Sequence, residues 1–224
     1  MNLKEFEKLN MSPAKSFILG MIFPFYTEKN AANGKRYILA QVKHNVTHIS
    51  EDDILEHHKI IKQFLRDYDL SEELKVIANQ TEEFGNLSGA QRGFTILIEK
   101  DSSEEEDESF KKIYKMVKDI EKENVEIKRS FVKGVFDGRG SIDKNSHLIV
   151  VDYRLSDDEF KTFSDIVTSL GFELVPNKRH VGEGRNKQFR IKTSSLKKFK
   201  DEIGFFSIRR KKYLDEMLNE LGVD

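Results

Sequence analysis

Apolar residues recur at helical spacing in two glycine-containing segments of this sequence, 13–22 and 130–138. This spacing predicts two short amphipathic helices. In the second segment Gly134 and Gly138 lie four residues apart and therefore share one helix face. A glycine inside a helix costs roughly 1 kcal/mol relative to alanine. We therefore expect a second helix to approach closely at these glycines, with Gly20 at the contact on the first segment.

The pattern around these two segments predicts the same order of elements twice: helix, two strands, helix, two strands, helix. Ser12 and Pro13 open the first helix as cap and first residue, whereas Gly138 and Gly140 are expected to end the helix of the second half. Alternating or apolar runs predict strands at 25–29, 36–44, 74–79, 93–98, 141–143, 147–153, 172–177 and 187–192. The other expected helices cover 50–69, 110–120, 156–170, 194–203 and 207–221.

Repetition at a spacing of about 114 residues is the strongest organisational signal in the chain. It aligns residues 17–25 with residues 131–139, so that Gly20 corresponds to Gly134. We therefore predict an α+β protein of two halves, 10–124 and 125–224, related by a pseudo-twofold axis.

Composition narrows the class of protein. The chain is 34% charged and 38% hydrophobic, has no cysteine and carries a formal net charge of −1. No apolar run approaches the roughly 20 residues that span a bilayer, and the first residues lack an apolar signal region. We expect a cytoplasmic monomer with no membrane contact. Residues 1–124 hold 18 Lys/Arg and 23 Asp/Glu, against 20 and 16 in residues 125–224, so the second half is the basic one.

The stretch 130–142 resembles the signature helix of LAGLIDADG homing endonucleases, whose common form reads Phe-Leu-Ala-Gly-Phe-Phe-Asp-Gly-Asp-Gly-Ser-Ile. The matching residues are Phe131, Gly134, Phe136, Asp137, Gly138, Gly140, Ser141 and Ile142. In the second half the resemblance extends to individual motif residues, whereas in the first half it is limited to the pattern of apolar residues and glycine. It implies two signature helices packed together and two curved antiparallel sheets that form a saddle over duplex DNA.

The sequence departs from the family at its catalytic acids. In the resembled family, one acid at the end of each signature helix holds the catalytic metal; the matching positions here are Phe25 and Arg139. Mg²⁺ prefers hard oxygen ligands, and arginine stays protonated. Asp137, Asp143 and Glu28 are close in sequence and are the candidates for displaced acids. We expect no catalytic residues, no metal and no cofactor, with Mg²⁺ needed only if the chain is a nuclease after all.

A basic strand–loop–strand segment, 177–200, contains nine Lys/Arg and one acid. A two-stranded ribbon fits the major groove of DNA, where Arg and Lys pair with guanine edges or phosphates; the alternative is a solvated surface hairpin. The residues predicted to contact DNA are Lys35, Arg36, Lys43, Arg139, Lys178, Arg179, Arg185, Lys187, Arg190 and Lys192.

These observations predict a protein that binds double-stranded DNA without cutting it, as the recognition component of a regulatory or restriction system whose chemistry a protein partner supplies. Two alternatives stay open. One is an active metal-dependent endonuclease with displaced acids. The other is a protein-interaction module that binds no DNA, which the near-neutral net charge favours.

Overall fold

The computed structural model describes residues 1–31, 34–45, 51–70, 74–78, 91–101, 103–143, 146–176 and 187–223. For residues 43–45, 51, 75–78 and 91–93 it describes the backbone only. None of the helices in these ranges combines the length and apolar character that a bilayer crossing requires.

Two four-stranded antiparallel sheets share one topology. The strands of the first sheet are β1 (Glu28–Asn30), β2 (Arg36–Asn45), β3 (Lys75–Ala78) and β4 (Gln91–Lys100), in the order β1-β2-β4-β3. Those of the second are β5 (Gly140–Asp143), β6 (Leu148–Tyr153), β7 (Leu174–Pro176) and β8 (Lys187–Ile191), in the order β5-β6-β8-β7. Every strand pair is antiparallel, as the predicted α+β class requires.

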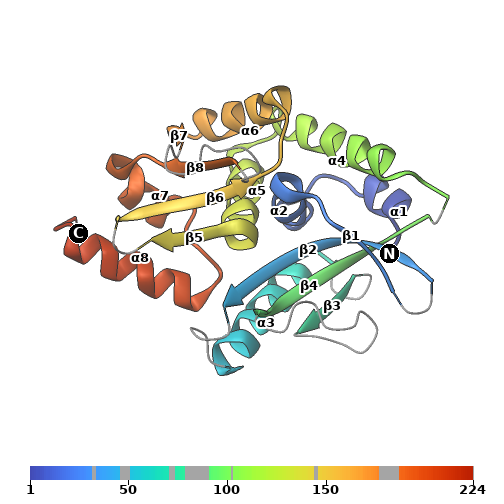
Figure 1. The fold of residues 1–224 in the computed structure, drawn as a ribbon, viewed down its shortest axis with the longest axis horizontal. Coiled ribbons are helices and arrows are strands. Elements are labelled where there is room, and N and C mark those ends of the chain that lie inside the picture. Colours follow the sequence, from blue (N-terminus) through green and yellow to red (C-terminus); the bar gives the residue numbers. More distant parts are fainter. Residues whose placement is uncertain are drawn as a thin grey trace.

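Helices lie between and around the two sheets (Figure 1). They are α1 (Leu3–Lys8), α2 (Pro13–Ile22), α3 (Glu51–Arg66), α4 (Glu106–Ile120), α5 (Val125–Arg139), α6 (Asp157–Ser169), α7 (Leu196–Glu202) and α8 (Ile208–Glu220). In the described ranges the 3-10 turn η1 (Phe23–Phe25) follows α2 directly, and the 3-10 turn η5 (Thr193–Ser195) precedes α7. Helices α2 and α5 occupy the middle of the molecule, with one sheet on either side (Figure 1).

Helices α2 and α5 pack backbone against backbone. A Cβ atom added to Gly20 would lie 2.1 Å from the Phe131 carbonyl oxygen. A Cβ added to Gly134 would lie 2.0 Å from the Phe17 carbonyl oxygen. The two contacts are reciprocal, because Phe17 and Phe131 are three residues before the respective glycines. Only glycine permits an approach this close, which explains why two short helices tolerate its low helix propensity.

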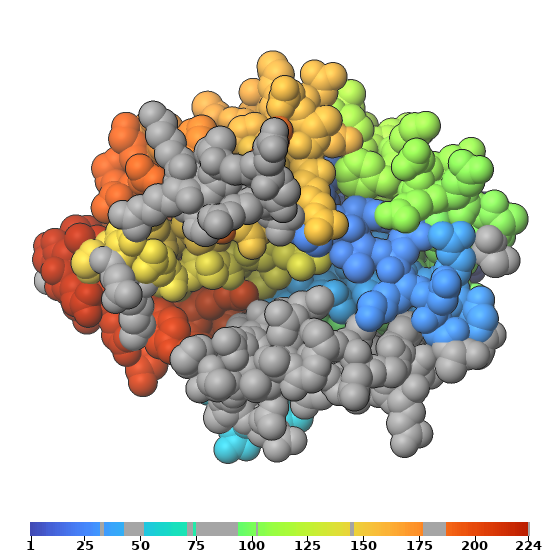
Figure 2. All heavy atoms as spheres, viewed as in Figure 1, coloured from blue at the N-terminus to red at the C-terminus, as the bar shows by residue number. Residues whose placement is uncertain are grey.

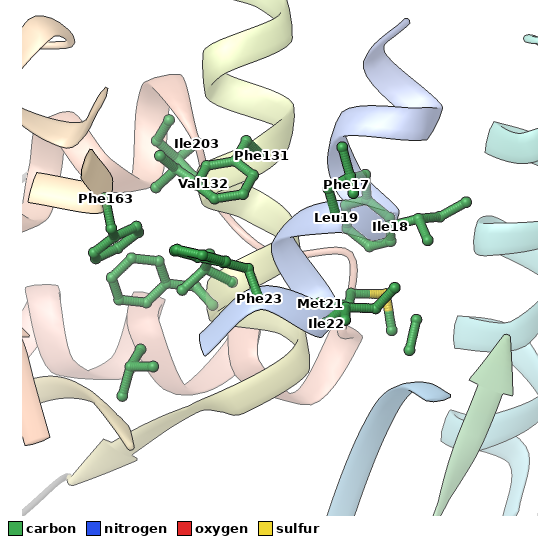
Figure 3. Close-up of a cluster of buried hydrophobic side chains, with 14 of the residues drawn as sticks. Phe17, Ile18, Leu19, Met21, Ile22, Phe23, Phe131, Val132, Phe163 and Ile203 are labelled. Atoms are coloured by element: carbon green, nitrogen blue, oxygen red, sulfur yellow. The ribbon is translucent and has the colours of Figure 1, made fainter. Parts of the chain in front are cut away.

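One apolar core surrounds this pair of helices. Alternate residues of the central strands face it, including Ile38 and Ile96 in the first sheet and Val151 and Phe189 in the second. Figure 3 shows side chains of α2 and η1 beside Phe131 and Val132 of α5 and Phe163 of α6. The described part of both halves therefore shares a core and does not divide into two separately packed units.

Helix α5 is longer than its apolar pattern predicts. It begins at Val125 and not at residue 130, because the Asn124 side chain accepts a hydrogen bond from the Ile127 N–H and caps the helix. It also continues to Arg139, so Gly138 lies inside the helix. A Cβ atom added to Gly138 would lie 3.1 Å from the Met21 Cα. The expectation that Gly138 leaves the helix was wrong, because helix packing requires it there.

Other elements also differ from expectation; α4, for example, begins at Glu106 and not at residue 110. Phe25 belongs to the 3-10 turn that contains Pro24, and the strand expected from residue 25 begins at Glu28. Helix α1, which lacks a long apolar period, was not predicted; Asn2 begins it with a reciprocal capping box. The expected helix 194–203 starts as the turn η5 and becomes α-helical at Leu196.

Substituting Gly134 tests the close helix packing. In Gly134→Ala the new methyl group collides with the Phe17 carbonyl, so we expect the free energy of unfolding to fall by about 1–3 kcal/mol in urea denaturation. Gly138→Ala is the matched control. Its Cβ meets Met21 at a less severe distance, and the gain in helix propensity of roughly 1 kcal/mol offsets much of the strain. Wild-type stability of Gly134→Ala would contradict the reciprocal packing.

Candidate nucleic-acid interface

The packing of α2 against α5 brings together the segments that follow the two helices. Arg139, the last residue of α5, donates from Nη2 to the Phe25 carbonyl oxygen at 3.1 Å and to Thr27 Oγ1 at 3.4 Å. The Arg139 guanidinium carbon lies 4.4 Å from the centre of the Phe25 ring. The two residues that replace the expected acids therefore contact each other.

A second arginine, which the sequence analysis did not identify, completes this centre. The backbone N–H of Arg154, directly after β6, donates to the Pro24 carbonyl oxygen at 2.8 Å. The Arg154 guanidinium carbon lies 4.1 Å from the Phe25 ring centre. The local sequence gives no signal for Arg154, because the pairing of β6 with β5 is what places the residue after β6 next to η1. We call Phe25, Arg139 and Arg154 the arginine centre.

The charge of Arg139 is weakly compensated within the described residues. Burial, and next the positive charge of Arg154, lower the pKa of Arg139 to about 10, while Asp152 acts in the opposite direction. Arg139 thus stays protonated at neutral pH. Within the described ranges no carboxylate lies at ion-pair distance from Arg139, and its buried Nε has no hydrogen-bond partner. The Asp152 carboxylate accepts a 2.5 Å hydrogen bond from Gln188 Nε2.

The outer face of the second sheet, turned away from the helices, carries polar side chains near this centre. Phe189 and Ile191 of β8 face the core, so Gln188 and Arg190 point to the other side. In the ladder with β6, Arg190 is opposite Val150 and Gln188 is opposite Asp152. Both Gln188 and Arg190 are half-buried.

Two of the basic residues predicted to contact DNA in the second half form ion pairs on the protein surface. Exposed Lys187 lies 3.4 Å from Asp157, and exposed Lys192 lies 2.7 Å from Glu173. Surface pairs of this kind are weak, so both cations can exchange partners. Three predicted contacts, Lys178, Arg179 and Arg185, lie outside the described residues.

The predicted basic residues of the first half are engaged within the chain. Lys35 pairs with Glu99 at 2.8 Å. Arg36 pairs with Glu28 at 2.8 Å and also donates to the Glu104 carbonyl oxygen. For Lys43 only the backbone, within β2, is described.

The outer face of the first sheet is apolar and buried, unlike that of the second. Tyr37, Leu39, Leu97 and Ala31 form a cluster of their own, separate from the main core. Leu39 and Leu97 are each 2% exposed, and Gln41, which donates to Thr95 at 3.3 Å, is equally buried. Side chains enclosed in this way cannot contact a nucleic acid.

Asp137, the retained acid of the motif, has a structural position. Its side chain is fully buried and accepts hydrogen bonds from the Phe206 and Ser207 N–H groups at 2.8 and 3.2 Å, at the start of α8. Arg210 donates to the Asp137 carbonyl oxygen, and its guanidinium is 3.9 Å from the carboxylate. Burial raises the pKa of Asp137 and lowers that of Arg210 to about 10, so each charge depends on the other.

The other two candidates for displaced acids are also engaged. Glu28 binds Lys100, whose side chain is fully buried, at 2.6 Å and Arg36 at 2.8 Å. Asp143 accepts from the Ser146 N–H at 3.3 Å. Across the described ranges no three His, Asp or Glu side chains gather in a group that could hold a metal ion.

The fold is similar to that of the homing endonuclease I-DmoI. A structure of its mesophilic variants matches with a TM-score of 0.55 at 15% identity, covering 93% of this chain and 100% of the other. I-DmoI in complex with DNA and Mn matches with a TM-score of 0.51 at 16% identity (87% and 98% covered), and its complex with DNA and Ca with 0.53 at 16% (93% and 100% covered). No protein-family model and no curated protein sequence matches the chain. At such low identity the likeness is one of fold, and the predicted homing-endonuclease-like α+β architecture is confirmed.

Removing the charge of Asp137 tests its structural role. Asp137→Asn leaves Arg210 buried without its carboxylate, so we expect the free energy of unfolding to fall by about 3–5 kcal/mol in urea denaturation. Asp165→Asn, which breaks an exposed pair with Lys161, is the control and is expected to change stability by less than about 1 kcal/mol. Asp137→Asn with wild-type stability would contradict the structural role.

Proposed function

We propose that this protein binds duplex DNA without cutting it. The observation that carries the proposal is the arginine centre: the ends of the two packed helices hold a phenylalanine and an arginine where the resembled nucleases hold metal-binding acids. The fold similarity to I-DmoI, which has been crystallised in complex with DNA, supports the DNA-binding part.

The charge of the centre argues against metal-assisted cleavage. Divalent ions activate water and neutralise phosphate only when oxygen ligands hold them in position. Arg139 and Arg154 repel a cation, and Asp152, the carboxylate that acts on Arg139, is hydrogen-bonded to Gln188. Asp137, Asp143 and Glu28 are each committed to contacts elsewhere. A role in recognition, with any chemistry supplied by a partner protein, fits this arrangement.

The second sheet is the better candidate for base contacts. Gln188 and Arg190 project from neighbouring positions of its outer face, and these residue types bind adenine and guanine edges in the major groove. Exposed Lys187 and Lys192 flank them on the same strand segment and supply charge for phosphates. Among the described side chains on the outer face of the first sheet, Tyr37, Leu39 and Leu97 are buried and offer no equivalent set.

Purified protein is expected not to nick or linearise supercoiled plasmid in Mg²⁺ or Mn²⁺, because the centre lacks carboxylates to hold either ion. The measurement is conversion of supercoiled to open-circular DNA on agarose gels, with EDTA as the control. Metal-dependent nicking by wild type that is lost in Asp152→Asn would overturn the non-catalytic proposal. It would favour the displaced-acid nuclease.

Binding is tested with a labelled duplex selected from a randomised pool. On the selected duplex, Arg190→Ala is expected to weaken binding by about 1–3 kcal/mol and to relax base preference at one position. Lys161→Gln, a charge loss on α6 away from the sheet face, is the control and should bind as wild type. If no duplex is bound even at low salt, the DNA proposal fails and the protein-interaction alternative, which the net charge of −1 favours, replaces it.

A further inference from the structure

The arginine centre places two like charges close together. Two guanidinium groups lie over one ring, at 4.4 and 4.1 Å from its centre. Cation–π attraction to the ring stabilises each guanidinium, but it does not cancel their mutual repulsion. The only carboxylate that acts on Arg139 within the described residues is Asp152, which also accepts from Gln188. Within the described residues the positive charge of Arg139 is therefore not paired with a carboxylate at ion-pair distance.

The arginine centre is also held in place before any ligand arrives. Arg139 is fixed through its Nη2 to Phe25 and Thr27, and the backbone of Arg154 is fixed to Pro24. A guanidinium has five N–H donors, and the hydrogen bonds of Arg139 within the described residues use Nη2 alone. Donors remain for a ligand, and a pre-organised site loses less side-chain entropy on binding.

We propose that Arg139 and Arg154, held against Phe25, form a binding site for one backbone phosphate of duplex DNA at the junction of the two halves. This inference rests on the proposed function. The planar forks of arginine match the oxygen geometry of a phosphate, and one anion between the two guanidiniums removes their repulsion. The centre thus binds directly the phosphate group that a nuclease binds through metal ions.

The position of the centre makes DNA the source of this phosphate. Arg154 is exposed and Phe25 is half-buried, so their contact lies at the surface; on the face drawn in Figure 2 the blue N-terminal segment meets the gold segment. Arg154 is exposed and follows the strand whose outer face pairs with Gln188 and Arg190. Arg154 is four residues beyond Val150, the partner of Arg190, which corresponds to about 13 Å along the strand. Because duplex DNA carries about one phosphate charge per 1.7 Å of its axis, a duplex that contacts Arg190 also has phosphates at this distance.

Salt dependence of DNA binding tests the site. A fluorescein-labelled random-sequence duplex is titrated by anisotropy between 50 and 200 mM KCl with wild type, Arg154→Gln, Arg154→Lys and the control Lys161→Gln. Loss of one phosphate contact lowers the slope of log K against log[salt] by about 0.9. The affinity advantage of wild type over Arg154→Gln should then shrink by about 3.5-fold over this range. Arg154→Lys keeps the charge and should keep most of the slope, and Lys161→Gln should match wild type.

A free anion provides an independent readout. At fixed ionic strength, replacing chloride by sulfate should raise the Tm of wild type more than that of Arg154→Gln or of Arg139→Gln. Arg154→Gln is the main variant because its side chain is exposed, whereas Arg139→Gln also removes hydrogen bonds to Phe25 and Thr27 and is judged by its Tm shift in sulfate alone.

The outcomes separate this inference from the proposed function. If wild type binds duplex DNA and Arg154→Gln binds with an unchanged salt slope, the phosphate site is wrong while the DNA-binding proposal stands. If wild type binds no duplex, the proposed function fails. A sulfate-dependent Tm shift without DNA binding would then show a site for a free anion and overturn its assignment to DNA. Reduced slope together with a reduced sulfate effect in Arg154→Gln supports the site as proposed.

Discussion

The contact between the backbones of α2 and α5 is the constraint on which the rest of the structure depends. Gly20 and Gly134 each lie against the carbonyl group that the other helix presents, and any side chain at either position would separate the helices. The contact unites the cores of the two halves and leaves one sheet on either side (Figure 1). It also brings the end of α5 to the turn after α2, so the helix packing itself builds the arginine centre.

The arginine centre has the opposite charge to a metal site built from carboxylates. A site with carboxylates attracts divalent ions and reaches phosphate through them; a site with two arginines attracts phosphate directly. The retained motif acid, Asp137, is consistent with this difference, because it serves the start of α8 and the buried Arg210 rather than the centre.

The two sheets have the same strand order but different outer faces. In the first, Tyr37, Leu39 and Leu97 form a buried apolar cluster. In the second, Gln188 and Arg190 are polar and partly accessible. Since an identical topology supports both surfaces, the fold alone does not decide which half contacts a ligand. The side chains on the outer face of each sheet determine which half can contact a ligand, and those in the described ranges favour the second half.

Local patterns were sufficient to predict most elements and their repeated order, because helix caps, apolar periods and glycine spacing act within a few residues. Ser12 and Ser156 cap their helices as the sequence indicates, and the glycine faces of residues 13–22 and 130–138 indicate the helix contact. Those patterns could not reveal Arg154 beside Phe25, the buried position of Asp137, or the enclosed outer face of the first sheet. Each of these depends on strand register or on the packing of elements distant in sequence. The sequence therefore carries the architecture, whereas the contact of Arg139 and Arg154 with Phe25 arises only where β6, η1 and α5 meet.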